Sequence, residues 1–181
     1  MASLFTHPVI PTALYIATGS SFVNKRILFL GILLSMLPDA DVLGYRLGVP
    51  YAHVFGHRGL SHSLLFAFCC AALLAALPWA STMRWRIMLF LFLATISHGV
   101  LDAMTRGGLG VGFFIPIVND RYFFAFRPIE VSPLSIRGFI SERGWFVFKS
   151  ELKSLWLPVL GASLCIALIR KSIQFRKKKF S

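Results

Sequence analysis

The chain has 181 residues, of which 56% are hydrophobic and only 14% are charged. Together with a mean hydropathy of +0.72, this composition excludes an ordinary water-soluble domain. The formal net charge of +12 would suit a nucleic-acid-binding protein, but Lys and Arg lie beside apolar segments and do not line one face, so we expect no nucleic-acid partner. We predict an all-α, polytopic helical membrane bundle whose partners are membrane lipids, with its oligomeric state left open.

Five apolar segments follow one another along the chain and predict about four to five hydrophobic helices. The third is the clearest, because it is long enough to cross a hydrocarbon core that needs about 20 helical residues. The first two are short, so they form either two spans or a shallow hairpin packed against the others. The segments are Pro8 to Val23, Ile27 to Leu37, Ser61 to Ala80, Trp85 to Met104 and Leu155 to Ile169.

These segments predict a single membrane domain over residues 1–170, with an extended external loop region at 105–154 and a basic cytoplasmic tail at 171–181. Basic clusters set the orientation, because Lys and Arg near span ends stay cytoplasmic. The clusters are Lys25 and Arg26, Arg84 and Arg86, and the run that starts at Arg170. Five crossings place all three on one side, with Trp79, Trp85 and Trp156 as interfacial anchors. The tail is expected to attract anionic lipid.

Residues that are costly in a membrane gather at the helix ends opposite these clusters. His7 begins the first segment, Asp39 and Asp41 end the second, His57 and His62 precede or begin the third, and His98 and Asp102 end the fourth. Antiparallel neighbours bring such ends together, which predicts a divalent-metal site on the non-cytoplasmic face. Imidazoles and carboxylates favour zinc, with manganese or iron as alternatives. For any one residue alone, packing or capping is the simpler explanation; the set favours a metal.

Local spacing adds detail to this prediction. His98 and Asp102 lie at i and i+4, so they share one helix face. In the segment Leu37 to Asp41, alternate carboxylates are expected to project toward the same ion. The stretch from His53 to Ser63 holds three histidines; there we expect Ser61 to cap the third helix, His62 to lie in its first turn, and Arg58 to be free to contact an anionic group. His53 is expected outside the first ring of ligands.

Several of these pieces together resemble the YdjM-type family of inner-membrane metal-dependent hydrolases, formerly a domain of unknown function. The pieces are His7-Pro8, LPDAD, HRGLSHS, SHGVLDAMT and NDRYFFAFRPIEVSP. The resemblance covers most of the chain and implies a hydrolase of the bacterial inner (cytoplasmic) membrane. It also implies that the metal-site residues are His7, Asp39, Asp41, His57, His62, His98 and Asp102.

The expected activity is hydrolysis of an ester or phosphoester of a lipid or lipid-linked substrate, since a metal lowers the pKa of water from 15.7 toward about 7. Asp39 or Asp41 would act as general base and Arg58 would stabilise the developing anion. Seven candidate ligands favour two ions about 3.5–4 Å apart over one. Alternatives are a metal-ion transporter or a non-catalytic metal-binding protein. External arginines either engage phosphate or extend to lipid headgroups. They are Arg106, Arg121, Arg127 and Arg137.

Overall fold

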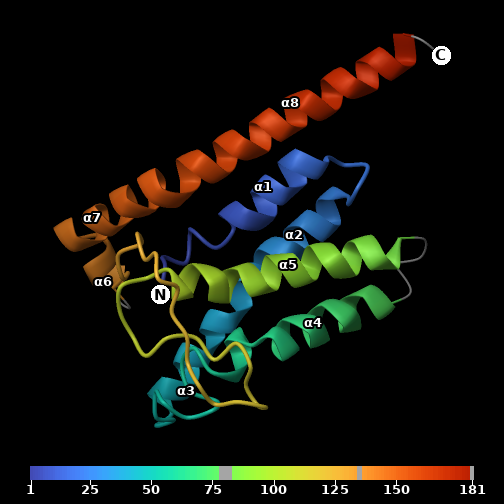
Figure 1. The fold of residues 1–181 in the computed structure, drawn as a ribbon. Helices are drawn as coiled ribbons and strands as arrows, with labels where there is room; N and C mark the ends of the chain where they lie inside the picture. The colour runs from blue at the N-terminus through green and yellow to red at the C-terminus, as the bar shows by residue number, and fades with distance from the viewer. Residues whose placement is uncertain (78–82, 134–135, 180–181) are drawn as a thin grey trace.

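A computed structural model describes residues 1–77, 83–133 and 136–179 of the chain (Figure 1). The described residues are helical, with β-structure limited to two isolated bridges, Thr105 with Ile129 and Val111 with Tyr122. The α-helices are α1 (Val9–Thr18), α2 (Lys25–Met36), α3 (Val42–Arg46), α4 (Leu64–Ala76), α5 (Arg84–Ala103), α6 (Ile136–Phe139), α7 (Glu142–Glu151) and α8 (Leu157–Lys179). Short 3₁₀ turns cover Leu37–Asp41 and Leu60–His62, and a π-helical turn covers Leu152–Trp156. The prediction of an all-α helical membrane bundle is confirmed.

Helices α1, α2, α4 and α5 form the bundle, and α8 packs along α1 (Figure 1). The order of contact is α4 on α5, α5 on α2, and α2 on α1. A core at the centre joins α2, α4 and α5 through Ile27, Leu34, Ala71, Phe90 and Leu91. Gly31 allows the close approach of α2 to α5, because a Cβ there would lie 2.6 Å from a ring carbon of Phe90. Helices α2 and α5 are thereby packed closely through a shared apolar core.

Three helical stretches are long and apolar enough to cross a membrane: Lys25–Gly44, Arg84–Ala103 and Glu142–Lys179. The expectation that the second segment is short is therefore wrong. The helical stretch that contains the second segment continues beyond Leu37. Pro38 does not end it, because this proline lies at the start of the 3₁₀ turn, where a missing N–H breaks no hydrogen bond. The third segment, predicted as the clearest span, begins at Leu64 and is helical to Ala76, while Trp79 and the predicted end at Ala80 lie outside the described residues.

The C-terminal part is one long helical stretch. Residues 142–154, predicted as loop, form α7 and the start of the π turn, which leads directly into α8. The basic residues from Arg170 to Lys179 lie on α8 and extend beyond the bundle (Figure 1). The non-helical part of the predicted loop runs from Thr105 to the last described residue before α6, Pro133.

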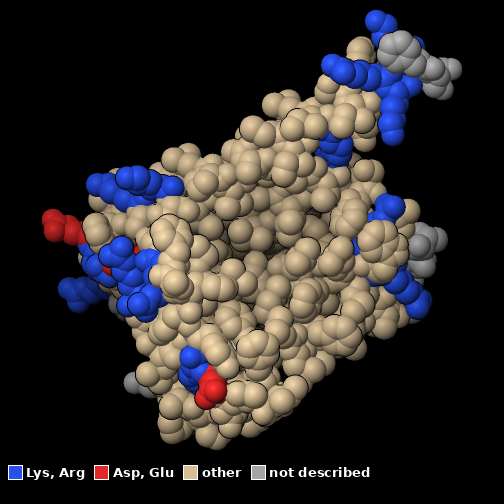
Figure 2. Space-filling view, in the orientation of Figure 1, with Lys and Arg blue, Asp and Glu red and all other residues tan. Residues whose placement is uncertain are grey.

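Charged side chains gather at the two ends of the molecule and leave an apolar middle (Figure 2). One end carries the starts of α2 and α5, with Lys25, Arg26 and Arg84. The other carries the region around α6 and α7, with Arg137 and Lys149 among its cations. An apolar band between charged ends is the surface expected of a protein that spans a bilayer.

Candidate metal centre

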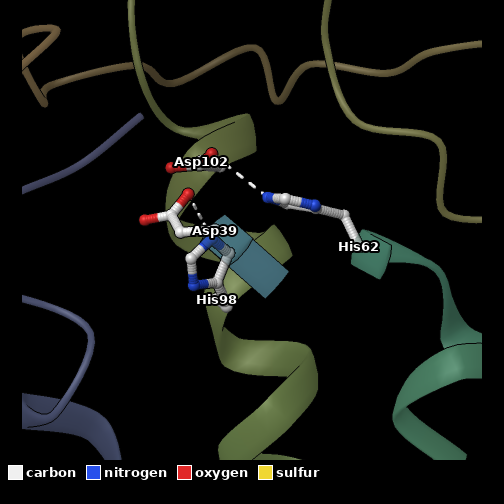
Figure 3. A group of neighbouring side chains, drawn as sticks. All are labelled: Asp39, His62, His98 and Asp102. Carbon is white, nitrogen blue, oxygen red and sulfur yellow. Dashed lines mark ion pairs between the residues drawn. The ribbon is translucent and has the colours of Figure 1, made fainter. Parts of the chain in front are cut away.

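The structure brings together all seven predicted metal-site residues at one end of the bundle. They come from four helix ends: the segment before α1, the 3₁₀ turn after α2, the turns before α4 and the last two turns of α5. Figure 3 shows four of the seven pointing toward one another: Asp39, His62, His98 and Asp102. Their exposed fractions are between 0% and 9%. The predicted convergence of helix ends is confirmed.

Asp39 lies at the centre of this group. Its Oδ1 is 3.3 Å from Nε2 of His98, and its Oδ2 is 3.9 Å from Nε2 of His7. The rings of His7 and His98 stack with centroids 3.7 Å apart. Both oxygens of Asp39, both nitrogens of His7 and Nε2 of His98 are inaccessible to solvent and accept or donate no hydrogen bond. An unpartnered buried polar atom costs about 1–3 kcal/mol, so a further ligand that contacts these atoms would stabilise the fold.

Two histidines are oriented by hydrogen bonds at their other ring nitrogen. Nδ1 of His98 donates to the carbonyl oxygen of Ser35 at 2.7 Å, which leaves Nε2 as a lone-pair donor facing Asp39. The Ser61 hydroxyl donates to Asp41 at 2.6 Å and therefore accepts from Nδ1 of His62 at 2.9 Å. Nε2 of His62 then faces the centre, 3.7 Å from Oδ2 of Asp102, again without a hydrogen-bond partner.

Asp41 has a supporting position. Its Oδ1 lies 2.6 Å from Nδ1 of His57, and its Oδ2 accepts from the backbone N–H of Arg58 at 3.1 Å and from Ser61. Asp41, His57 and His62 have ligand atoms close enough to hold an ion, but hydrogen bonds already occupy the Asp41 oxygens. The expectation that Asp39 and Asp41 project toward the same ion is not met, because the two carboxylates contact different histidines.

Arg58 is not free to contact an anionic group, contrary to the sequence-based expectation. Its side chain is 0% exposed and donates to Oδ2 of Asp102 at 2.9 Å, to the carbonyl of Gly107 at 2.7 Å and to Oγ1 of Thr105 at 2.9 Å. Oδ1 of Asp102 accepts from the backbone N–H of Ala2 at 2.8 Å. Asp102 therefore has a partner at each oxygen, and Arg58 holds it beside His62.

Two further expectations about this loop are wrong. The cap of α4 is Ser63, whose hydroxyl accepts from the N–H of Phe66, while Ser61 is used to hold Asp41 and His62. His62 accordingly lies in the 3₁₀ turn before α4 and not in the first turn of the helix.

Two peripheral residues, His53 and Arg121, do not contact the centre. His53 is exposed and accepts from the N–H of Phe55, so it lies outside the centre. Arg121, expected either to engage phosphate or to extend to lipid headgroups, donates instead to the backbone carbonyls of Tyr51, His53 and His57. It thereby fastens the histidine-containing loop to the long loop that follows α5.

Two of the histidines outside the spanning helices, His7 and His62, have opposite shifts in pKa. Burial, and next the neighbouring His98, lower the pKa of His7 to about 3, so this ring is neutral and ready to bind a metal. For His62, burial acts in the same direction, but the nearby carboxylates of Asp102 and Asp41 outweigh it and raise the pKa to about 9. A protonated His62 thus supplies positive charge to the acidic side of the centre.

The donor atoms fit a divalent cation. Two atoms bound to one ion at about 2.1 Å lie no more than about 4.2 Å apart, and the contacts of Asp39 with His98 and with His7 meet this limit. His62 belongs to a group with Asp39, His98 and Asp102 whose ligand atoms all lie within 4.8 Å of one another. Three imidazoles with a carboxylate are a ligand set that suits zinc, and also iron or manganese. The unpartnered atoms belong to His7, Asp39, His62 and His98.

Sequence reasoning missed several residues that support the centre. Gly99 allows α5 to approach the backbone of the His62 turn, since a Cβ there would lie 3.1 Å from the carbonyl oxygen of His62. Glu151 is fully buried and accepts from Ser3 N, Ser3 Oγ and Thr6 Oγ1, which fixes the segment that leads into His7. The one sequence signal for Glu151 was the position of an acidic residue close to an apolar segment, and the neighbouring lysines obscured that signal.

Comparison with known proteins identifies the family. The family model described as the YdjM inner membrane protein matches residues 1–174. The chain belongs to the YdjM family. A curated relative, the inner membrane protein YbcI of Escherichia coli strain K12, is 41% identical over 160 residues, which cover 87% of this chain and 92% of the relative. No solved structure matches this YdjM-family chain.

Proposed function

We propose that this protein binds one divalent metal ion through His7, Asp39, His62 and His98 and acts as a membrane-bound hydrolase. The observation that carries the proposal is the convergence of unpartnered, buried ligand atoms from four separate helix ends. Asp102 borders the same site. Of the one or two ions expected from the sequence, the hydrogen bonds around Asp41 favour one, because Asp41 and His57 already partner each other.

A bound divalent cation would supply Lewis-acid activation of water and of an ester or phosphoester oxygen. The chain's own residues divide the remaining tasks. Asp39 has no hydrogen-bond donor at either oxygen, so with one oxygen on the ion its other oxygen, and not Asp41, is suited to accept a proton. Asp41 orients His57 and His62, and Arg58 neutralises Asp102, so neither is proposed to contact substrate.

The substrate class follows from where the centre lies. Its residues come from the ends of apolar helices, with the middle of the bundle covered by apolar side chains (Figure 2). A water-soluble substrate would approach a site next to this apolar surface less easily than an amphiphile already in the bilayer. We therefore propose an ester or phosphoester of a membrane lipid or lipid-linked molecule, with the centre on the non-cytoplasmic side of the inner membrane, opposite the basic clusters.

The first test is the metal content of detergent-purified protein, measured by mass spectrometry of the elements. We expect about one ion per chain in the wild type and less than about one tenth of that in His98→Ala and Asp39→Asn. His53→Ala is the matched control, because it removes an exposed histidine outside the centre and should keep the metal. A well-folded wild type that cannot be loaded with zinc, manganese or iron would contradict the proposal.

Hydrolysis of a phospholipid panel by the same samples tests the activity. Metal-dependent turnover that is lost in His98→Ala and kept in His53→Ala supports the hydrolase. The burial of the whole ligand set also favours a second candidate, a non-catalytic metal-binding protein, since each ligand is at most 9% exposed. Tight metal binding without turnover on any lipid would support this second function. Metal uptake into vesicles would instead support transport.

A further inference from the structure

A basic groove lies beside the candidate metal centre, at the end of the molecule that carries α6 and α7. Its volume is about 700 Å³. The described residues that line it include three cations and no acid: Arg106, Ala125, Phe126, Arg127, Pro128, Lys153 and Ser154. Figure 2 shows Lys and Arg side chains gathered at this end of the bundle.

The cations of the groove are only partly neutralised. Arg106 pairs with Glu130 at 3.3 Å, but the same carboxylate also pairs with Arg143 at 3.1 Å. Within the described part of the chain, Arg127 and Lys153 have no carboxylate within 4 Å. The guanidinium of Arg127 lies over the ring of Phe123, 4.9 Å from its centroid, which restricts where it points. The groove therefore offers positive charge to an anion, and its two guanidinium groups suit phosphate.

Exposed apolar side chains next to the groove favour a lipid over a free anion as its ligand. Phe126, which lines the groove, is 71% exposed. Lys153 lies one turn before Leu157, and the exposed leucines Leu157, Leu164 and Leu168 continue along α8 toward the apolar middle of the molecule. A phosphate held at Lys153 would thus have an apolar helix surface leading away from it, which suits the acyl chains of a phospholipid.

The groove also shares a wall with the metal centre. The last turn of α5 carries Asp102, and the segment that follows carries Arg106, whose backbone N–H donates to the carbonyl of Ile129 at 3.2 Å. Between them, Thr105 contacts the guanidinium of Arg58, the residue that holds Asp102. A headgroup in the groove would therefore lie against the same short segment that positions the centre.

We propose that this groove binds the phosphodiester headgroup of a membrane phospholipid, with Arg106, Arg127 and Lys153 contacting the phosphate and the acyl chains lying along α8. That the bound lipid is the substrate rests on the proposed function. Binding in the groove does not, because none of the cations that line it is a proposed metal ligand.

The test uses full-length protein in detergent after metal removal by EDTA, with native mass spectrometry and a titration of short-chain phosphatidylglycerol. Arg127→Gln/Lys153→Gln should bind phosphatidylglycerol at least about tenfold more weakly than the wild type. The matched control Arg137→Gln/Lys149→Gln removes the same charge from the same end of the molecule, outside the residues that line the groove, and should stay within about twofold.

Two further ligands separate the sources of the phosphate. Inorganic phosphate should compete only weakly; competition as strong as that of the lipid would overturn the proposal in favour of a free-anion site. Diacylglycerol, which lacks the phosphate, should not bind comparably, and equal binding would also overturn it. Equal losses in the groove variant and the control would show nonspecific charge attraction. Metal content measured on untreated samples keeps the two proposals separate. Lipid binding by a protein that holds no metal before EDTA treatment and cannot be loaded with one would support the groove and contradict the proposed function.

Discussion

The imidazole rings of His7 and His98 lie stacked, with their centroids 3.7 Å apart and only 13° between their planes. Two protonated rings at this distance would repel each other, so the arrangement requires that at least one be neutral. The position of His98 is fixed by the carbonyl of Ser35, and that of His7 by the segment before α1. The pair therefore places two nitrogen atoms that could bind a metal beside the carboxylate of Asp39.

Replacing His7 should make the metal-free protein less sensitive to acid. In the unfolded chain His7 gains a proton as the pH falls through 6.5, whereas in the folded protein burial and His98 keep it neutral until about pH 3. The unfolded state binds more protons in this window, so the free energy of unfolding contributed by His7 falls as the pH drops from 6.5 toward 3, by on the order of a few kcal/mol. The melting temperature of EDTA-treated His7→Asn should therefore decline less steeply between pH 6.5 and pH 3 than that of the wild type.

His53→Asn is the control for this measurement, because His53 is exposed and should leave the decline unchanged. If His7→Asn and the wild type lose stability in parallel from pH 6.5 to 3, His7 is not held neutral in the folded protein, and its assignment as a preset ligand is wrong.

Zinc affinity should rise with pH up to about 9. Although burial opposes it, Asp102 and Asp41 keep His62 protonated below about pH 9 in the metal-free protein, and a metal binds only the neutral ring. Each unit of pH below 9 should therefore weaken binding by about tenfold, in a competition titration against a chelating dye from pH 7 to 9. Asp41→Asn should flatten this dependence, since it removes a negative charge, 3.2 Å from Nδ1 of His62, that favours the protonated ring. A flat profile in the wild type would remove His62 from the ligand set.

The sequence predicted where the site lies but not how its members divide the work. Polar residues are rare within apolar helices, so the grouping of His98 and Asp102 with the other helix ends was visible from spacing alone. Asp39 and Asp41 were indistinguishable by that criterion. The 3₁₀ turn over Leu37–Asp41 rotates by about 120° per residue, so side chains two positions apart point in clearly different directions. One carboxylate consequently meets His98 and the other His57.

The roles of Arg58 and Glu151 were also beyond sequence reasoning, for related reasons. Glycines on both sides of the His57–Arg58 pair indicated an open loop, whereas the structure buries Arg58 completely against Asp102. Glu151 lies among lysines that predicted an exposed segment, and its partners Ser3 and Thr6 come from the other end of the chain. Long-range hydrogen bonds of this kind leave no periodic pattern.

The backbone of Arg58 allows its side chain to be tested separately from its conformation. Arg58 has a φ of 63°, in the left-handed region that glycine adopts without cost. Arg58→Ala should reduce the free energy of unfolding by about 3–5 kcal/mol, because it leaves Asp102 buried without its ion-pair partner. Arg58→Gly loses the same contacts but relieves the strain, so it should be more stable than Arg58→Ala by about 1 kcal/mol. Denaturation in detergent with urea provides the comparison, and an alanine variant more stable than the glycine variant would contradict the left-handed conformation.

Glu151 should affect metal binding although it lies outside the centre. Its carboxylate accepts from the N–H and hydroxyl of Ser3 at 2.5 and 2.6 Å and from the hydroxyl of Thr6 at 2.9 Å, immediately before His7. Trp156 donates to the same Thr6 hydroxyl oxygen at 2.8 Å, which ties this segment to the π turn before α8. Glu151→Gln keeps the shape but weakens the charge-assisted hydrogen bonds, at a cost of about 2 kcal/mol in the free energy of unfolding.

With its leading segment loosened, His7 should be held less firmly, and we expect zinc affinity to fall by about tenfold, within the range typical of residues that orient a metal ligand. Glu142→Gln is the matched control, because Glu142 is exposed in the first turn of α7. Affinity measured on the folded fraction separates the two effects. A Glu151→Gln protein that is less stable but binds zinc as tightly as the wild type would show that this glutamate supports the fold alone and that His7 keeps its position without it.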